Sequence, residues 1–364
     1  MEVLVPHQDL SRALELIGKV SSKNLTLPVL QCVRIEAAGE VITLEATNLE
    51  ISISVPLKGS VVEEGVVAVP AQTLLQSIQF IPQREVTLRT EDQVLQLETE
   101  TSNTSIKTFL AEEFPIIHKI TGEEISINAA QFAHGIRSVA FAASLTSIKP
   151  ELGSVFVQQK KEHSLTFVAT DSFRLMEKTV SQKGVVLDQS FMVPHKNALE
   201  LARVCEVLGE DARLVVTENQ CALTFPSGVY ISSRLITGSF PDYVQIIPKE
   251  FVSHVVALKE DLLRSFKKTN IFLNKFRQVS MTITSQGLTI ASHNNEVGHT
   301  TDSIKAEVEG DELTLNFNQQ YVLDPLQYIH DDAVKLSFAG IGRAVIMEGA
   351  NDKTLRYLVM PMNK

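Results

Sequence analysis

Short runs of alternating apolar and polar residues recur along the chain and predict a protein built mainly of β-strands. The run from Ile51 to Val55 alternates with a period of two, which is typical of a strand with one buried face. Further strands are predicted in the first third of the chain at residues 3–5, 29–36, 41–46, 66–69, 86–89, 94–98 and 105–110.

Helical periodicity is confined to a few short segments between these strands. Leu10, Leu14 and Ile17 share one face of a helix predicted from Gln8 to Val20. A second helix is predicted from Pro70 to Phe80, because the fixed φ of proline suits the start of a helix.

This order of strands and helices restarts twice. The later helices are predicted at 131–143, 195–208, 261–268 and 318–329. The positions that correspond between copies are Asp9, Gln131 and Asp261; Thr47 and Thr170; Pro70 and Pro194; and the pairs Phe114-Pro115 and Phe240-Pro241. The copies are about 122 to 130 residues apart, which is far longer than a solenoid repeat, so each copy is predicted to be a domain.

The fold class predicted from this pattern is α+β, with three repeated domains that each place two helices on antiparallel sheet. The domains are predicted at residues 1–121, 122–248 and 249–364. A turn after the second strand of each copy is predicted at 47–50, 170–173 and 292–295.

The middle turn, within Val168 to Leu175, is the stretch that could carry chemistry. Asp171 and Arg174 are either catalytic or a salt-bridged turn, and Asp and Ser commonly bond their own backbone in turns. A hydrolase that uses this turn is disfavoured, because His163 and His195 lie nearby in sequence without a placed nucleophile.

Composition narrows the class of protein. The 364 residues carry a net charge of −10, which argues against a protein that finds DNA by bulk electrostatics. Tryptophan is absent and aromatic residues are sparse, so aliphatic cores are predicted. Three cysteines without a CxxC pattern argue against a disulfide framework and a structural zinc site.

The remaining signals argue against cofactor and metal chemistry. His293 and His299 lie six residues apart without an acidic cluster, which favours a solvated turn over a metal site. Neither GxxxxGK[ST], HExxH nor GxSxG occurs, so no cofactor or metal is predicted. The start of the chain lacks the pattern of a signal peptide and no apolar run spans a bilayer, so a cytoplasmic protein is expected.

Four stretches, in order along the chain, resemble the bacterial sliding clamp, the beta subunit of the replicative DNA polymerase. They are Leu27-Pro28-Val29-Leu30; Ala169 to Leu175, which is similar to A-T-D-G-H-R-L; Phe240-Pro241-Asp242-Tyr243 with Pro248; and Tyr357 to Met362, which ends in V-M-P-M. The resemblance covers essentially the full length of the chain.

This resemblance implies a non-catalytic processivity factor. Two three-domain chains would pair head to tail into a ring of six domains, with helices lining a hole around double-stranded DNA. A ring is retained by topology, so a net charge of −10 is compatible with this function. The implied partners are the replicative polymerase catalytic subunit, the clamp loader, and repair and translesion polymerases.

The resemblance also assigns residues to three surfaces. A pocket for partner peptides is expected at Leu152, Thr170, Phe173, Arg174, Leu175, Pro241, Ile246, Asn318, Tyr321, Val359, Met360, Pro361 and Met362. Candidates that face DNA are Lys23, Arg137, Lys149, Lys196, Arg264 and Lys267. The dimer interface is expected at Ile106, Thr108, Ile271 and Phe272.

The chain departs from the family pattern inside the expected pocket. Ser172-Phe173 replaces the commoner Gly-His, and Gln245 stands where some members have Arg, so peptide preference is expected to differ. Two alternatives stay open: a soluble enzyme built on the same repeats, and a clamp homologue that serves repair or regulation instead of replication.

Overall fold

The computed structural model describes residues 1–21, 26–146 and 148–362, and each predicted domain contains two α-helices within these ranges. The helices are α1 (His7–Ile17), α2 (Ala71–Ile78), α3 (Ala129–Ala140), α4 (His195–Leu208), α5 (Lys259–Thr269) and α6 (Gln319–Leu323). Short 3₁₀ helices are η1 (Pro28–Gln31), η2 (Ala111–Glu113), η3 (Pro150–Gly153), η4 (Tyr243–Ile246), η5 (Asn270–Phe272) and η6 (Asp324–Gln327).

Antiparallel strands make up most of the remaining chain. They are β1 (Glu2–Pro6), β2 (Cys32–Ala38), β3 (Val41–Thr47), β4 (Ile51–Leu57), β5 (Ser60–Glu63), β6 (Gly65–Pro70), β7 (Glu85–Glu91), β8 (Val94–Glu98), β9 (Asn103–Lys107), β10 (Ile125–Ile127), β11 (Ser154–Gln158), β12 (Ser164–Thr170), β13 (Arg174–Ser181), β14 (Phe191–Pro194), β15 (Ala212–Val216), β16 (Gln220–Thr224), β17 (Tyr230–Arg234), β18 (Ser253–Leu258), β19 (Gln278–Thr284), β20 (Gly287–Asn294), β21 (Gly298–Ile304), β22 (Ala306–Gly310), β23 (Leu313–Asn318), β24 (Ala333–Phe338), β25 (Val345–Gly349) and β26 (Leu355–Val359).

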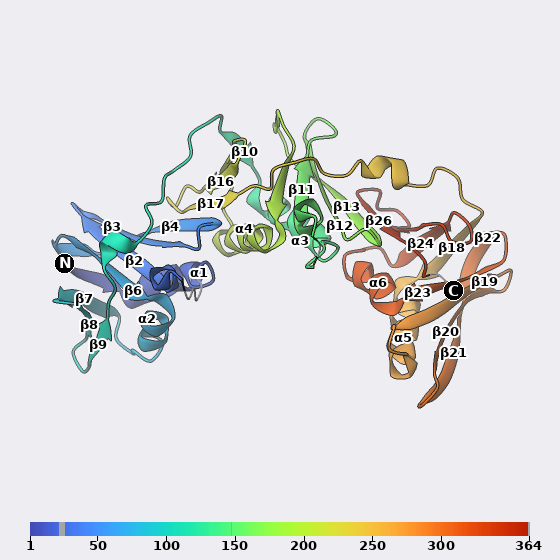
Figure 1. The fold of residues 1–364 in the computed structure, drawn as a ribbon, viewed down its shortest axis with the longest axis horizontal. Helices are drawn as coiled ribbons and strands as arrows, with labels where there is room; N and C mark the ends of the chain where they lie inside the picture. The colour runs from blue at the N-terminus through green and yellow to red at the C-terminus, as the bar shows by residue number, and fades with distance from the viewer. Residues whose placement is uncertain (22–25, 147, 363–364) are drawn as a thin grey trace. The chain divides into compact units, whose positions relative to one another are not determined.

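The chain divides into two compact units, and the middle repeat contributes to both (Figure 1). Unit 1 holds a five-stranded sheet, β5-β1-β7-β8-β9, and an eight-stranded sheet, β10-β15-β16-β17-β4-β3-β2-β6. Unit 2 holds a nine-stranded sheet, β14-β11-β12-β13-β26-β25-β24-β18-β22, and a four-stranded sheet, β21-β20-β19-β23.

Each large sheet joins strands of two consecutive repeats through one ladder. In unit 1, Ile51, Ser52 and Ile53 of β4 pair with Ser233, Ser232 and Ile231 of β17. In unit 2, Arg174, Leu175 and Met176 of β13 pair with Val359, Leu358 and Tyr357 of β26. Ile51 lies four residues after Thr47, and Arg174 lies four residues after Thr170. The two ladders therefore begin at equivalent positions of the two repeats and have the same register.

The helices pack on these sheets through the apolar stripes that the sequence predicts. In α4, for example, Ala198, Leu201, Ala202 and Cys205 are buried, at helical spacing. At Gly135 in α3, a Cβ would come within 2.3 Å of the Phe167 ring. Glycine at this position therefore lets the helix approach β12 closely. The largest buried side chains include Tyr230, Tyr357 and Phe132. The cores therefore also contain aromatic side chains, whereas the sequence predicted aliphatic cores.

Two sequence predictions in the third repeat need correction. The predicted turn at 292–295 begins too early, because Ser292 and His293 pair with Thr300 and His299 and extend the β20–β21 hairpin. The predicted helix from Asn318 to Ile329 ends as α6 at Leu323 and continues only as the 3₁₀ turn η6, which contains Pro325. Proline lacks the N–H that an α-helix would need there.

A cluster of titratable side chains in unit 2 predicts acid sensitivity. The rings of His134 and His330 stack with 6.0 Å between centroids, and Lys178 bonds Asp352 at 3.3 Å. Burial lowers the pKa of His134, and the nearby charges of Lys178 and His330 lower it further, against the opposite effect of Asp352. On acidification below about pH 6.5, the unfolded chain therefore takes up this proton before the folded chain does.

Replacing His134 with glutamine should reduce the dependence of the free energy of unfolding on pH, because this proton is no longer taken up. In the native chain, the contribution of His134 is fully present above about pH 6.5 and falls as the pH drops toward the lowered folded pKa. Urea unfolding at a series of pH values between 5 and 8 would measure the slope, with exposed His118→Gln as the matched control. Equal slopes in native chain and His134→Gln would contradict the prediction.

Candidate functional site

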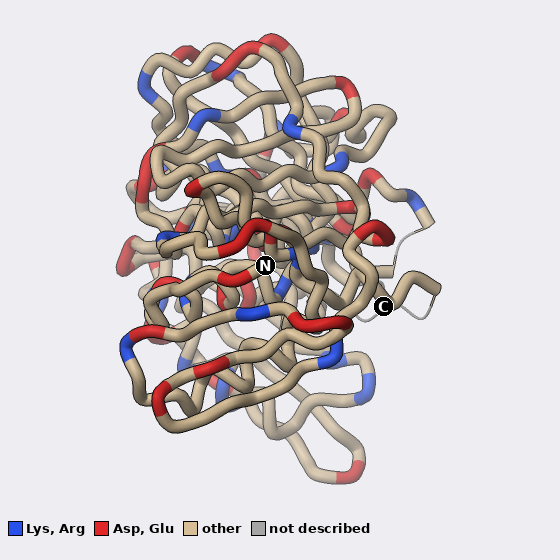
Figure 2. The backbone as a smooth tube through the Cα atoms, turned by 90° about the vertical axis from the view of Figure 1, so that its left-hand side faces the viewer, with Lys and Arg blue, Asp and Glu red and all other residues tan. Residues whose placement is uncertain are grey.

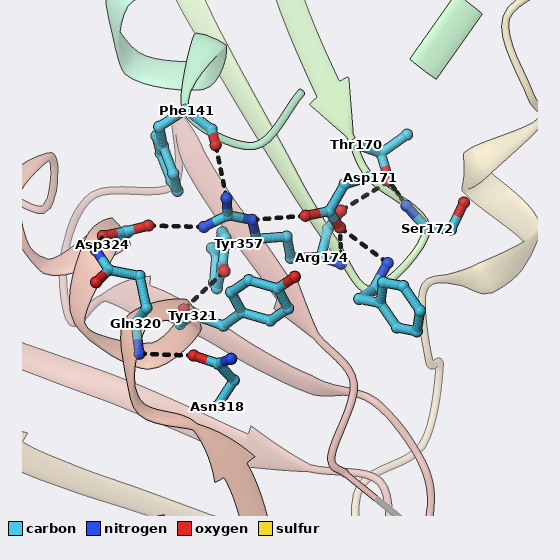
Figure 3. A network of polar contacts seen from close by, with 11 residues as sticks. Phe141, Thr170, Asp171, Ser172, Arg174, Asn318, Gln320, Tyr321, Asp324 and Tyr357 are labelled. Atoms are coloured by element: carbon cyan, nitrogen blue, oxygen red, sulfur yellow. Dashed lines mark hydrogen bonds and ion pairs between the residues drawn. The ribbon is translucent and has the colours of Figure 1, made fainter. Parts of the chain in front are cut away.

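The turn between β12 and β13 is held by its own side chains (Figure 3). Thr170 Oγ1 donates to the Arg174 carbonyl at 2.7 Å and accepts from the Ser172 N–H at 3.2 Å. Asp171 Oδ1 accepts from the Phe173 and Arg174 N–H groups at 2.9 and 3.0 Å. Asp171 therefore braces the turn, which is the second of the two interpretations that the sequence left open.

The first repeat contains the same turn. Thr47 Oγ1 donates to the Ile51 carbonyl, and Asn48 Oδ1 accepts from the Glu50 and Ile51 N–H groups at 3.0 and 2.9 Å. In both turns the third residue is left-handed, with φ of 75° at Leu49 and 76° at Ser172. The repeat seen in sequence is therefore a repeat of hydrogen bonds.

Ser172→Gly should stabilise the chain by about 0.5 kcal/mol. A left-handed residue with a Cβ costs about 1–2 kcal/mol, and the greater freedom of glycine in the unfolded chain offsets part of the gain. Urea unfolding would measure the change. The control is Ser105→Gly in β9, an exposed strand position where glycine should lower stability instead. A destabilised Ser172→Gly chain would contradict the strain argument.

Arg174 connects this turn to two other elements of unit 2. Its Nε donates to Asp171 Oδ2 at 2.9 Å, and its Nη1 donates to Asp324 Oδ2 in η6 at 2.7 Å. Its Nη2 donates at 2.8 Å to the carbonyl of Phe141, just beyond α3. The guanidinium also lies over the Tyr321 ring, 4.4 Å from the centroid. All three guanidinium nitrogens and one face of the group are therefore engaged.

The α6 side of this network is held by Tyr357 and Asn318. Burial raises the pKa of Tyr357, which keeps its hydroxyl protonated, and this hydroxyl donates to the Tyr321 carbonyl at 2.7 Å. Asn318 caps α6 by accepting from the Gln320 N–H at 3.0 Å, and Gln320 in turn bonds Asp324.

The C-terminal tail adds a backbone wall beside the turn. The Met360 N–H donates to the Phe173 carbonyl at 2.8 Å, and the Met362 N–H donates to the Asn316 carbonyl at 2.7 Å. Val359 pairs with Arg174 in the β13–β26 ladder. The tail, the turn and β23 are therefore joined by backbone bonds that fix their spacing.

Residues 236–252, here called the strap, run from the middle repeat to the third and carry a row of aromatic and aliphatic side chains. Phe240 stacks on Phe156 of β11 with 4.6 Å between ring centroids. Tyr243 is held by Glu177, to which its hydroxyl donates at 2.5 Å, and by Gln158 at 2.8 Å. The strap is thus fixed to one face of the nine-stranded sheet.

These contacts bring most of the residues predicted for peptide binding together in unit 2. We call this surface the turn–tail site: the turn 170–175, the strap, α6 with Asn318, and residues 359–362. Leu152, Thr170, Leu175 and Val359 are buried and act as its support. Phe173 and Ile246 are 62% and 55% exposed, and Pro241 is also exposed. Arg174, Asn318, Tyr321, Met360, Pro361 and Met362 are half-buried.

Sequence reasoning missed several residues of this site. Phe141 and Asp324 hold Arg174, and no local pattern marks either residue. Tyr357 holds Tyr321; it lies in a stretch that resembles the family but was not assigned to the site. Ala344 and Ile346 of the β24–β25 hairpin join Leu175 in a buried cluster below the strap. Ile346 lies in the buried strand β25 and Ala344 lies just before it, and nothing else in the sequence marks either residue.

The residues predicted to face DNA lie on several helices. Arg137 is on α3, Lys196 on α4, and Arg264 and Lys267 on α5, while Lys149 lies between α3 and η3. All but half-buried Arg137 are exposed, and Lys23 lies outside the described residues. On the side that carries the N-terminus, acidic and basic residues are interspersed (Figure 2).

The residues predicted for the dimer interface lie on or beside two sheet edges. Ile106 belongs to β9, the edge strand of the five-stranded sheet, and Thr108 follows that strand. Ile271 and Phe272 form part of η5, and Phe272 lies against Gly298 of the edge strand β21. Ile271 is 65% exposed.

Three family models match the chain in succession. They describe the N-terminal domain of the DNA polymerase III beta subunit at residues 1–118, its central domain at 126–242 and its C-terminal domain at 244–363. The chain belongs to the DNA polymerase III beta subunit family. The sequence-based recognition of a sliding clamp, and of an α+β fold with three clamp domains, is thereby confirmed.

The chain is similar to its relatives over its whole length. The beta sliding clamp of Pseudomonas aeruginosa is 27% identical over 371 residues, covering 100% of both chains. The crystal structure of the DNA polymerase III subunit beta from Pseudomonas aeruginosa has a TM-score of 0.94 at 26% identity and full coverage of both. A structure of the Pseudomonas aeruginosa clamp bound to griselimycin has a TM-score of 0.93 at 25% identity, again over both full chains.

Within the described residues, no group of three or more His, Cys, Asp or Glu side chains could hold a metal ion. His293 and His299 face each other across the β20–β21 hairpin, with 6.4 Å between ring centroids. Cys32, Cys205 and Cys221 are buried, and burial raises the pKa of each thiol to about 12. No described helix is long and apolar enough to cross a membrane.

Proposed function

We propose that two copies of this chain close head to tail into a ring around double-stranded DNA, and that the turn–tail site docks short peptide segments of replication and repair proteins. The chain then acts as a non-catalytic tether that confers processivity. The two in-chain strand ladders are the observation that supports this proposal most directly.

The ladders predict how the ring closes. The first repeat pairs β4 with β17 of the second repeat, and the second pairs β13 with β26 of the third. In the third repeat, β21 corresponds to β4 and β13. In the first repeat, β9 corresponds to β17 and β26. Both β21 and β9 are edge strands of their sheets. A β21–β9 ladder between two chains would use both edges, and repeating it would close a symmetric dimer.

The shared register predicts the contacts at that closure. His293 precedes Asn294 as Thr170 precedes Asp171, and His299 pairs with His293 as Leu175 pairs with Thr170. Aligning Ile106, the one buried residue of β9, with Val359 of β26 then places Gly298 opposite Ile106 of the second copy. Phe272, which lies against Gly298, would cover this pair.

Ile271→Asp should convert the dimer to a monomer. Ile271 is 65% exposed in the isolated chain and would be buried beside β9 in the ring, where an unpaired charge is costly. We expect the dissociation constant to rise by about 100-fold or more, measured by multi-angle light scattering over a dilution series. Ile341→Asp, at an 80% exposed loop position, is the matched control. An unchanged dimer in Ile271→Asp would contradict this interface.

Retention on DNA tests the whole proposal. The chain, loaded by its clamp loader onto a nicked circular DNA, should stay bound at high salt and leave when the circle is cut. Topological retention resists salt, whereas phosphate contacts weaken steeply with it. Loss of the protein from uncut circles would reject the ring.

Peptide docking at the turn–tail site rests on its exposed apolar side chains. Phe173 and Ile246 project from rigid backbone, and Met360 and Met362 can adapt to different ligands. The Arg174 network fixes the floor beneath them, so binding would not have to order the site. The proposed partners are the replicative polymerase catalytic subunit, the clamp loader, and repair and translesion polymerases. We place the three domains at residues 1–121, 122–248 and 249–364.

A further inference from the structure

The junction between the first two repeats reproduces the framework of the turn–tail site within unit 1. The Arg234 N–H donates to the Glu50 carbonyl at 2.8 Å, as the Met360 N–H donates to the Phe173 carbonyl. The adjoining turns share the threonine and Asx hydrogen bonds described above, and the adjoining ladders share one register.

A second strap, residues 114–120, crosses this junction. Phe114 packs against buried Val29, Cys32 and Ala68, and the Ile120 N–H donates to the Tyr230 hydroxyl at 3.0 Å. Pro115, which corresponds to Pro241, lies between these two anchor points. The second strap is therefore held at both ends, as the strap of unit 2 is.

Between this strap and the turn lies a cavity of about 270 Å³, here called the first-junction groove. Leu49 and Ile116, which line it, are 43% and 80% exposed. Ser52 and Gln220 add uncharged polar groups. An exposed aliphatic pair beside polar groups is the composition of sites that take extended peptides.

The charged groups of this groove differ from those of the turn–tail site. Buried Ile51 stands where Arg174 stands in the second repeat, and exposed Glu50 replaces Phe173. Arg234 brings an exposed guanidinium whose Nε donates to the Leu49 carbonyl at 2.9 Å, and His118 lines the groove beside it. The planar fork of Arg234 suits a carboxylate.

We propose that the first-junction groove is a second docking site, for an extended partner segment with aliphatic side chains and an acidic residue. The aliphatic side chains would cover Leu49 and Ile116, and the carboxylate would bind Arg234. The groove has the same turn, strap and strand ladder as the turn–tail site, so this inference rests on the proposed peptide-docking function of that site.

Methyl NMR of the full-length chain can test this assignment, because Ile116 and Ile246 report on the two sites separately. The chain is labelled at isoleucine δ1 methyl groups and titrated with acetyl-Leu-Leu-Glu-amide up to about 10 mM. We expect a saturable shift of the Ile116 methyl, at least fivefold weaker with acetyl-Leu-Leu-Lys-amide. The same shift should persist in Phe173→Ala and weaken at least fivefold in Arg234→Gln.

The outcomes separate this inference from the proposed function. A shift at Ile246 without one at Ile116 would overturn the second site and leave the turn–tail site standing. A shift at Ile116 alone would support the second site and count against peptide docking at the first. Equal affinity for the two peptides, or for native chain and Arg234→Gln, would overturn the carboxylate assignment. Silence at both methyls would overturn the inference altogether.

Discussion

Replacing Arg174 with alanine is expected to lower the free energy of unfolding by about 3 kcal/mol and to abolish peptide binding at the turn–tail site. The guanidinium side chain is 12% exposed, and it bonds Asp171, Asp324 and the Phe141 carbonyl. Its removal leaves two largely buried carboxylates without their cation and uncouples the turn from α6 and α3. Urea unfolding and calorimetric titration would measure the two effects.

A conservative variant separates charge from geometry. Arg174→Lys keeps the charge, but an ammonium group cannot reach three acceptors in a plane as the guanidinium does. It should therefore recover less than half of the lost stability. A double-mutant cycle with Asp324→Asn should show a coupling of about 1–3 kcal/mol, since the two residues are in direct contact. If the two substitutions lowered stability additively, Arg174 and Asp324 would not act as one network.

Replacing Phe173 with alanine should weaken peptide binding by more than about 1 kcal/mol, roughly fivefold or more, while leaving the fold intact. The ring is 62% exposed in the isolated chain, so its removal should change the stability of the fold by less than about 0.5 kcal/mol. A bound peptide would cover the ring and turn it into a buried aromatic anchor. Calorimetry with a peptide from the replicative polymerase measures the loss.

Phe80→Ala provides the matched control for this measurement. Phe80 is 86% exposed, and it lies just after α2 in unit 1, whereas the turn–tail site belongs to unit 2. Its removal should leave peptide affinity unchanged. If Phe173→Ala bound the peptide as tightly as the native chain does, the ring would have no place in recognition.

The parts of the fold that sequence predicted are those in which local chemistry repeats. Thr47 and Thr170 mark equivalent turns because each hydroxyl bonds the carbonyl four residues on. The match between Pro194 and Pro70 located α4 from His195 to Leu208. The third turn was misplaced because β20 continues its pairing with β21 through Asn294, three residues further than the turn pattern indicates. Ladder pairing between distant strands outweighed the local turn signal.

The turn–tail site was predictable only where a resemblance supplied it. Arg174 was assigned to the site in this way, but its partners Asp324 and Phe141 lie 150 and 33 residues away along the chain. Nothing in the local pattern around either residue signals that contact, since long-range pairing depends on how the repeats are joined. The same holds for Tyr243, whose bond to Glu177 spans 66 residues.

The state of the three cysteines has a practical consequence for optical experiments. A thiolate attacks a thiol-reactive dye, whereas the thiols of Cys32, Cys205 and Cys221 are inaccessible and remain protonated at neutral pH. A single exposed substitution such as Glu40→Cys, in the β2–β3 hairpin, would therefore take up one fluorophore without prior removal of the native thiols. Met1 and Met362 are poorer places for a dye, because the Met1 amino group bonds Thr90 and the Met362 N–H donates to the Asn316 carbonyl.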